Sequence, residues 1–382
     1  MENSELFTHL KKIFLYFGVW KSKEINGIKG KLYDIYALYL KLAVILAAAS
    51  FICNVFNANK LSRSGFANYG GWVSTTSVTA IKILICQTHN IPDRFENIFQ
   101  KEAEMYNTND EQLRRLHKSI TGPILKAFLS FFFFVQATNV LILCLCAYFY
   151  YIYWIEKLTL HPFEMFLPFD RDKTYEFSLV IYVLSETATG SMAYVMDMTL
   201  LVFVIYYILK LKTLQQILKH YTYYLSKDKN MEGSNFGFKF RYADTREFWR
   251  SCIFEHQNII AEVGILDKDM SKLFFIDFFL RTLQMAGFCL GCITAEEFMH
   301  KLFGLGCVLC SSSQLIILYW YGQVLASESL AVSDAIYESK WYEADVEIQR
   351  ILLMMMRRSQ KWLSLKLGKF DEVTLRTVLK VS

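Results

Sequence analysis

Long apolar stretches alternate with charged segments along the whole sequence. A membrane core about 30 Å thick needs roughly 20 mostly apolar residues of helix to cross it. The stretches that meet this length are predicted to span a membrane, and they are residues 36–56, 69–88, 127–153, 178–209, 272–294 and 303–325. The second is the weakest, because it is rich in Ser and Thr and contains Lys82. A seventh helix is predicted to begin near Thr374, but the chain stops at Ser382, before a further crossing is complete.

The positions of Lys and Arg predict on which side of the membrane each loop lies, since cytoplasmic flanks are enriched in them. Lysines crowd the segment before the first span, and the segments after the second and fourth spans are also basic. The other loops carry little net positive charge. This alternation predicts a cytoplasmic N-terminus, which is the opposite of the orientation of a G-protein-coupled receptor.

The predicted cytoplasmic segments also have helical periodicity. Apolar residues recur at helical spacing within 92–120 and 210–270, as at Leu211, Leu214 and Leu218. Such stripes are typical of helices that continue below the membrane and pack together. We therefore predict an all-α polytopic membrane protein that forms a single domain over residues 1–382.

Composition supports a membrane protein. Apolar residues make up 54% of the chain and charged residues 20%, whereas soluble domains average roughly 45–50% and 25%. The basic N-terminal segment lacks the apolar core and cleavage site of a signal peptide. The sequence has no phosphate-binding loop and no basic stripe interleaved with aromatic residues, so nucleic acid is not an expected partner.

The C-terminal region carries the most distinctive motif. It combines a Tyr-x-x-x-Trp pair, a Met- and Leu-rich helix that ends in Arg-Ser-Gln-Lys, and a Gly-Lys turn. Its positions are Tyr337, Trp341, Asp345, Arg357, Arg358, Ser359, Gln360, Lys361 and Gly368. Together with Leu167-Pro168-Phe169-Asp170, this motif resembles the insect odorant receptor family, although Trp362 stands where that family usually has Pro.

This resemblance implies the seven-transmembrane insect chemoreceptor fold, with a cytoplasmic N-terminus and a cytoplasmic helical anchor. It also implies an odorant-binding subunit of a ligand-gated, non-selective cation channel, a hetero-tetramer with the odorant co-receptor. Such channels act in smell, in the plasma membrane of olfactory neuron dendrites. The family's last helix lines the pore and extends beyond the point where this chain ends, so the resemblance implies C-terminal truncation. Residues 344–360 match the anchor, with Val346, Leu353 and Met356 as apolar surface.

The resemblance further implies a ligand site among the second, third, fourth and sixth spans. A volatile organic ligand is expected to occupy an apolar, aromatic pocket with few polar groups. The matching positions are Trp72, Thr75, Thr76, Leu143, Ala147, Tyr150, Ile181, Tyr182 and Ser185. The alternative for each is a place in the core or against lipid, since Trp and Tyr gather at the interfaces of any membrane protein.

Ionisable residues within the spans are candidates for function. Asp277 and Arg281 lie four residues apart with the acid first, which favours a local ion pair. Lys82, Glu186 and Asp197 have no partner on their own helices. Lys82 is expected to reach the inner interface, and Glu186 to face the ligand pocket or a water-filled vestibule.

Two Cys-x-x-Cys pairs, Cys289/Cys292 and Cys307/Cys310, have the spacing of zinc ligands. Both lie in apolar helices, where the thiolates that zinc requires are costly. Free, packed cysteines are favoured, with a disulfide or a metal site as alternatives. No catalytic motif is present, and the histidines are scattered. We expect no enzyme, no cofactor and no metal.

Three other classes of membrane protein remain as alternatives. A gustatory receptor of the same superfamily would share the architecture but not the Arg-Ser-Gln-Lys motif. A secondary transporter usually has repeated halves and interrupted helices, and the sequence shows neither. A G-protein-coupled receptor would have the opposite orientation.

Overall fold

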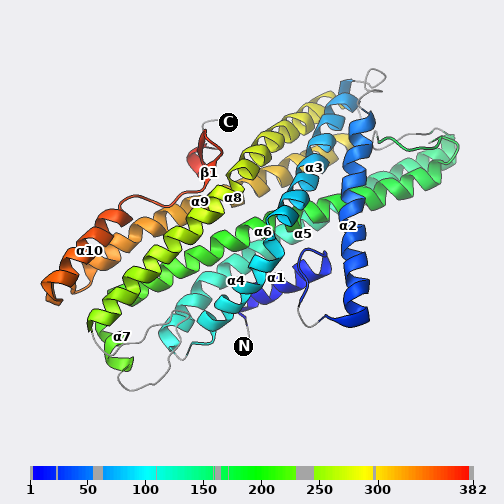
Figure 1. The fold of residues 1–382 in the computed structure, drawn as a ribbon. Coiled ribbons are helices and arrows are strands. Elements are labelled where there is room, and N and C mark those ends of the chain that lie inside the picture. Colours follow the sequence, from blue (N-terminus) through cyan, green and yellow to red (C-terminus); the bar gives the residue numbers. More distant parts are fainter. Residues whose placement is uncertain are drawn as a thin grey trace.

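The computed structural model describes residues 3–22, 25–54, 63–108, 110–157, 159, 165–170, 172–228, 245–295 and 298–377. Over these residues the chain is a bundle of long helices with one small hairpin (Figure 1). The elements are α1 (Glu5–Tyr16), α2 (Gly27–Cys53), α3 (Arg63–Thr88), α4 (Ile91–Tyr106), α5 (Glu111–Glu156), α6 (Tyr175–Lys219), α7 (Tyr221–Asp228), α8 (Thr245–Thr294), α9 (Phe298–Glu338), a 3-10 turn (Trp341–Glu343), α10 (Val346–Ser359), β1 (Lys366–Leu367) and β2 (Asp371–Glu372).

Each of the six predicted spans lies within a helix of its own, although residues 55 and 56 of the first fall outside the described residues. Within the described part of the chain, α2, α5, α6, α8 and α9 are long and apolar enough to cross a membrane. The prediction of an all-α polytopic membrane protein is therefore confirmed.

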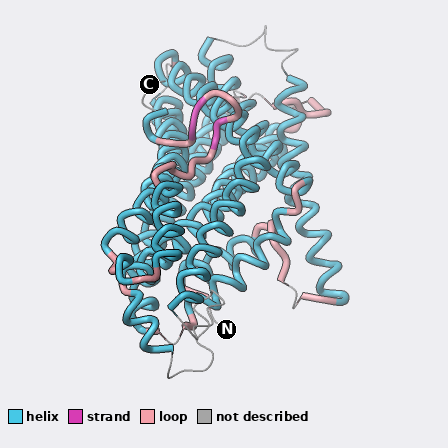
Figure 2. The backbone as a smooth tube through the Cα atoms, turned by 60° about the vertical axis from the view of Figure 1, so that its left-hand side comes forward, coloured by secondary structure: helices cyan, strands magenta, loops and turns pink. Residues whose placement is uncertain are grey.

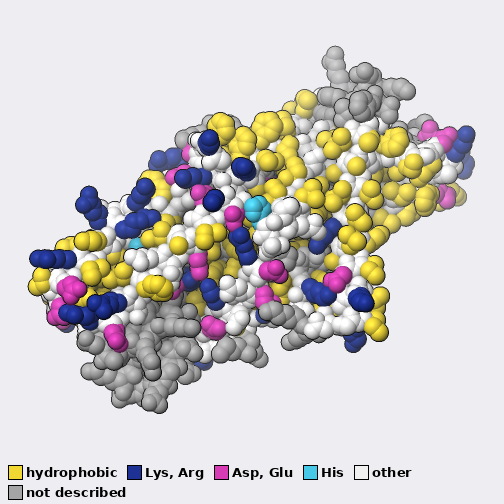
Figure 3. All heavy atoms as spheres, viewed as in Figure 1, with side chains coloured by type: hydrophobic (Ala, Val, Ile, Leu, Met, Phe, Trp, Pro, Cys, Tyr) yellow, Lys and Arg dark blue, Asp and Glu magenta, His cyan; other side chains and the backbone are white. Residues whose placement is uncertain are grey.

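Several helices are longer than a membrane crossing needs. At 1.5 Å per residue, the 50 residues of α8 extend about 75 Å, more than twice the thickness of a membrane core of about 30 Å. Hydrophobic side chains cover the half of the molecule around α2, whereas charged side chains gather toward α10 (Figure 3). The long helices thus leave an apolar band at one end of the bundle and extend beyond it at the other.

The helix α6 forms the centre of the bundle. Its most apolar stretch is wholly buried, and it packs against α2, α3, α5, α8 and α9. A helix that is apolar on every side is stable only when neighbours surround it. This central position means that the cavities beside α6 are enclosed by several different helices.

The weakly apolar helix α3 satisfies its hydroxyl groups internally. Thr75, Thr76 and Thr79 each donate a hydrogen bond to the backbone carbonyl four residues earlier. A hydroxyl that is bonded in this way can lie in an apolar environment at little cost. The Ser- and Thr-rich sequence of 69–88 is therefore compatible with a helix inside the bundle.

The C-terminal motif ends in a short hairpin on the side of the bundle (Figure 2). Lys366 pairs with Glu372, and Leu367 pairs with Asp371. Gly368 has a φ of +61° at the turn and donates its backbone N–H to the carbonyl of Ser271 in α8. The predicted Gly-Lys turn is confirmed. Of the predicted last helix, residues 375–377 are helical and 378–382 lie outside the described residues.

A glycine in α9 allows this hairpin to pack closely. A Cβ atom added to Gly322 would overlap the backbone carbonyl oxygen of Val373. The variant Gly322→Ala is expected to displace the hairpin and to destabilise the protein by about 1–3 kcal/mol, the usual range for overpacking. The measurement is the melting temperature of the purified protein. Gly122→Ala is the matched control, because a Cβ atom there meets no atom within 4 Å. Equal melting temperatures for the two variants would contradict the close packing of the hairpin.

Candidate functional site

A cavity lies between α3, α5, α6, α8 and α9. It has about 600 Å³ of space between atoms, part of it open to the outside. Ligand pockets for small organic molecules usually have mostly apolar walls with a few polar groups. Apolar atoms also form most of the exposed surface of the wall here, and the apolar side chains include Val78, Val135, Ile142, Ala193 and Phe288. The composition of the walls suits a small, largely apolar molecule.

Two aromatic side chains close one end of the cavity. The rings of Trp72 and Phe288 meet edge to face, with centroids 5.5 Å apart. Phe51 of α2 stacks on the other side of Trp72, at 6.5 Å. Gly71 makes this packing possible, because a Cβ atom there would lie 2.7 Å from the ring of Phe288.

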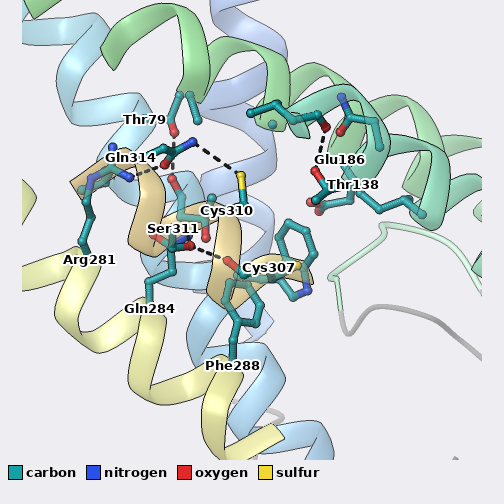
Figure 4. Close-up of a pocket in the computed structure, with 18 residues that line it drawn as sticks. Thr79, Thr138, Glu186, Arg281, Gln284, Phe288, Cys307, Cys310, Ser311 and Gln314 are labelled. Atoms are coloured by element: carbon teal, nitrogen blue, oxygen red, sulfur yellow. Dashed lines mark hydrogen bonds between the residues drawn. The ribbon is translucent and has the colours of Figure 1, made fainter. Parts of the chain in front are cut away.

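The other end of the cavity is polar (Figure 4). Gln284 donates a hydrogen bond of 2.7 Å to the hydroxyl of Ser311, and that hydroxyl donates to the carbonyl oxygen of Cys307. Arg281 donates to the side-chain oxygen of Gln314. The helices α8 and α9 are therefore joined by a set of hydrogen bonds at this end.

Arg281 also belongs to a buried cluster of four charges, which we call the ion cluster: Lys82, Asp197, Asp277 and Arg281. The Lys82 ammonium lies 2.6 Å from Asp277 and also contacts Asp197. The Arg281 guanidinium contacts both carboxylate oxygens of Asp197, at 2.6 and 2.7 Å, and one oxygen of Asp277, at 3.0 Å. The exposed fractions of the four side chains are 8% or less. Two cations and two carboxylates thus balance one another in the interior.

The ion cluster confirms one sequence-based expectation and corrects another. The predicted pair of Asp277 and Arg281 is present. Lys82, expected to reach the inner interface, is instead 1% exposed and paired with carboxylates of α6 and α8. Its partners are 115 and 195 residues away in sequence, so helical spacing could not reveal them.

The residues that were predicted to contact a ligand fall into several places. Trp72 and Thr75 line the cavity. Thr76 is buried in α3 but does not line it, and Tyr182 is buried in an adjoining apolar cluster. The remaining predicted positions, on α5 and α6, do not line the cavity.

On α5 the predicted positions lie on an exposed face. Leu143 and Tyr150 are 46% and 44% exposed, and Ala147 is exposed as well. The face of α5 that lines the cavity carries Asn139 and Ile142 instead. Leu143, Ala147 and Tyr150 therefore do not line this cavity, although α5 contributes to its wall.

On α6, two predicted positions line a different hollow. Ile181 and Ser185 line a wide groove between α2, α6 and residues 165–168. We call it the α2–α6 groove. Glu186, the next residue after Ser185, lines the cavity instead. The expectation that Glu186 faces a pocket is therefore confirmed.

The sequence-based prediction included the sixth span, which lies in α9, but named no residue of it, and it left out the fifth span, which lies in α8. Arg281, Gln284 and Phe288 line the cavity from one face of α8, at helical spacing. Cys307, Ser311 and Gln314 do the same from α9. This helical spacing is visible in the sequence. It identifies cavity-lining residues only once the packing of α8 and α9 against α6 is known. All nine cysteines have free thiols, and no cluster of three metal-ligating side chains occurs among the described residues.

The C-terminal motif lies beside α8 and α9, away from the cavity. α10 buries Ile348, Leu352 and Met355 against these helices. Val346 and Leu353 are 63% and 49% exposed. The structure thus agrees with the prediction that this helix offers apolar surface, although Met356 is partly buried against the core.

The residues of this motif have separate surroundings. Ser359 is buried, and its hydroxyl lies 3.4 Å from the Nε2 atom of His256. Burial and the nearby Arg358 lower the pKa of His256 to about 4, so this imidazole is neutral at pH 7. Trp341 packs against the core. Exposed members of the motif are Tyr337, Asp345, Arg357, Gln360 and Lys361.

Comparison with known proteins gives a consistent result. Residues 72–382 match the sequence model of the 7tm odorant receptor family. Odorant receptor 85b of Drosophila melanogaster is 39% identical over 71 residues, which is 19% of this chain and 18% of that protein. Odorant receptor 10 of Aedes albopictus is 25% identical over 121 residues, 32% of each chain. The matched segments thus cover about a fifth to a third of these relatives.

The fold has counterparts among solved structures. The insect olfactory receptor OR5 from Machilis hrabei superimposes with a TM-score of 0.72, over 98% of this chain and 95% of that receptor, at 14% sequence identity. The same receptor in complex with eugenol gives a TM-score of 0.71 at 15% identity. At this identity the likeness concerns the fold.

Proposed function

The chain belongs to the 7tm odorant receptor family, and we propose that it is the odorant-binding subunit of a ligand-gated, non-selective cation channel formed with the odorant co-receptor. This family consists of chemoreceptors of the ion-channel type and not of enzymes. The proposal includes a hetero-tetramer, a cytoplasmic N-terminus, one receptor domain over residues 1–382, and a place in the plasma membrane of olfactory neuron dendrites.

The cavity between α3, α5, α6, α8 and α9 is the observation that carries this proposal. The surface of its wall is largely apolar, with an aromatic end and a polar end, and this composition suits a small organic molecule. A receptor with the same fold binds eugenol, which supports a small organic ligand for this chain. We place the ligand in this cavity, with Trp72 and Thr75 among its contacts.

Opening of the channel is explained by a shift between two packings of the helices. A ligand can favour the open state only as far as it binds that state more tightly than the closed one. The cavity is well placed for such a difference, because five separate helices contribute to its walls. A small relative movement of α8 and α9 would change the shape of the cavity.

Whole-cell recording tests the proposal. The chain is expressed alone and together with the co-receptor, and the co-receptor is also expressed alone. We expect cation currents evoked by members of a volatile panel in the presence of the co-receptor, and none from the co-receptor alone or from this chain alone. Silence in every combination, with both subunits at the cell surface, would refute the channel assignment.

A further inference from the structure

Glu186 is a buried carboxylate without a hydrogen-bond partner in the part of the chain that the structure describes. Its side chain projects from α6, has no exposed surface, and lines the cavity. Neither carboxylate oxygen has a hydrogen-bond partner among the described residues. A buried carboxyl group without such a partner costs free energy, and unpaired groups of this kind are rare enough in folded proteins to need an explanation.

The nearby cations are fully engaged elsewhere. Arg281 binds Asp197, Asp277 and Gln314, and Lys82 binds the same two aspartates. The two positive and two negative charges of the ion cluster balance, so no positive charge is left over for Glu186. In Figure 4, Glu186 approaches the cavity from the side of α5 and α6, opposite Arg281 and Gln284 on α8.

The hydroxyl groups around the cavity are also engaged. Thr75 and Thr138 donate to backbone carbonyls of their own helices, at 2.8 and 2.7 Å. Ser311 donates to the carbonyl of Cys307. Among the lining residues that the structure describes, Glu186 is therefore the one whose buried side-chain oxygens have no hydrogen-bond partner at all.

We propose that Glu186 binds a hydrogen-bond donor, a hydroxyl or amino group, on an otherwise apolar ligand that occupies this cavity. This inference rests on the proposed function, because it assigns the chemical class of the ligand that the receptor binds. A hydroxyl group donates a hydrogen bond to the carboxylate, or both donates to and accepts from the protonated carboxyl group. An amino group carries a positive charge beside the carboxylate, and the pair is neutral overall. The apolar walls contact the rest of the ligand.

A matched series of ligands tests the proposal. The series has one carbon skeleton that carries a hydroxyl group, a primary amino group, a methyl ether or only hydrogen. Binding is measured on the purified receptor complex in lipid nanodiscs, as the concentration dependence of the shift in melting temperature. We expect the alcohol or the amine to bind at least roughly tenfold more tightly than the ether, because hydrogen bonds to charged groups are stronger than those between neutral groups. Equal binding of all four compounds would overturn the proposal.

Two substitutions of Glu186 distinguish recognition of a hydroxyl group from recognition of an amino group on the ligand. In Glu186→Gln the amide oxygen still accepts from a hydroxyl group, but the charge that attracts an amine is gone. An alcohol preference should survive this change and an amine preference should not. In Glu186→Leu both preferences should disappear. Glu176→Gln is the control, because Glu176 is exposed in the first turn of the same helix. A donor preference that persists in Glu186→Leu would contradict the assignment.

The ligand-free protein supplies a second measurement. Removal of an unpaired buried carboxyl group relieves its desolvation cost, so Glu186→Leu is expected to raise the melting temperature of the ligand-free complex. A lower melting temperature would show that Glu186 supports the fold and would overturn its role as a ligand contact. These measurements report binding and stability and not current. Donor-selective binding without any evoked current would therefore refute the channel proposal while supporting the role of Glu186.

Discussion

The variant Lys82→Met is expected to lose most of its folded protein. Asp197 and Asp277 would then share a single cation, Arg281, in a site where the exposed fractions are 8% or less. Removal of one member of a buried ion pair typically costs about 3–5 kcal/mol, because the remaining charge is left uncompensated. This is a large fraction of the roughly 5–15 kcal/mol that stabilises a typical folded protein. The measurement is the yield of monodisperse receptor and its melting temperature.

A second substitution should reverse much of this loss. In Lys82→Met/Asp277→Asn the cluster again has equal charges, because Arg281 keeps both of its contacts with Asp197, at 2.6 and 2.7 Å. Residues in one network interact, so the double variant should be more stable than the sum of the single effects. Arg115→Met is the control: its pair with Glu111 is more than 70% exposed, and exposed pairs contribute at most about 1 kcal/mol. A double variant no better than Lys82→Met would refute the charge balance.

The ion cluster also explains how α3 takes its place in the bundle. This helix is less apolar than its neighbours, yet it packs extensively on α8. Lys82 of α3 reaches Asp277 of α8 and Asp197 of α6, so its charge can be satisfied in one arrangement of these helices. Apolar packing alone would leave the rotation of α3 poorly determined, since apolar side chains are accommodated by lipid as well as by protein.

The same physical argument accounts for which parts of the site could be predicted. The pair of Asp277 and Arg281 lies within one helix, so its spacing sufficed. The spans were predictable because the length and apolarity of a crossing are set by the bilayer. The rotation of each helix was not, because a helix between protein and lipid is apolar on both sides. Leu143 and Tyr150 are consequently exposed, while Ile142, on the same helix, lines the cavity.

Local backbone chemistry was likewise easier to predict than contacts between distant segments. The positive φ of Gly368 follows from a turn that its own sequence forms. The approach of Val373 to Gly322 depends instead on how the hairpin is placed against α9. Strands of two residues carry no periodicity of their own, so the hairpin itself had no signal beyond its turn.

Substitutions that enlarge a side chain can show which hollow the ligand occupies, because the larger side chain takes up the space of the ligand. Ala193 lines the cavity, whereas Ala188, five residues earlier on α6, lines the α2–α6 groove. A Phe side chain at 193 would occupy the space of the proposed ligand, so Ala193→Phe is expected to lower sensitivity to every evoking ligand by at least roughly a hundredfold, which corresponds to about 2.7 kcal/mol of lost binding. The measurement is the concentration dependence of ligand-evoked current, with surface expression as the reference.

The matched variant gives this experiment its second arm. Ala188→Phe makes the same substitution on the same helix but fills the groove, so the response should stay close to that of the unsubstituted receptor. Loss of response in Ala188→Phe together with a normal response in Ala193→Phe would move the ligand to the groove, where Ile181 and Ser185 lie. Glu186 would then face a cavity that no ligand enters, and its missing partner would need another explanation. The pair of variants therefore tests the placement of the ligand and the premise of its recognition by Glu186 together.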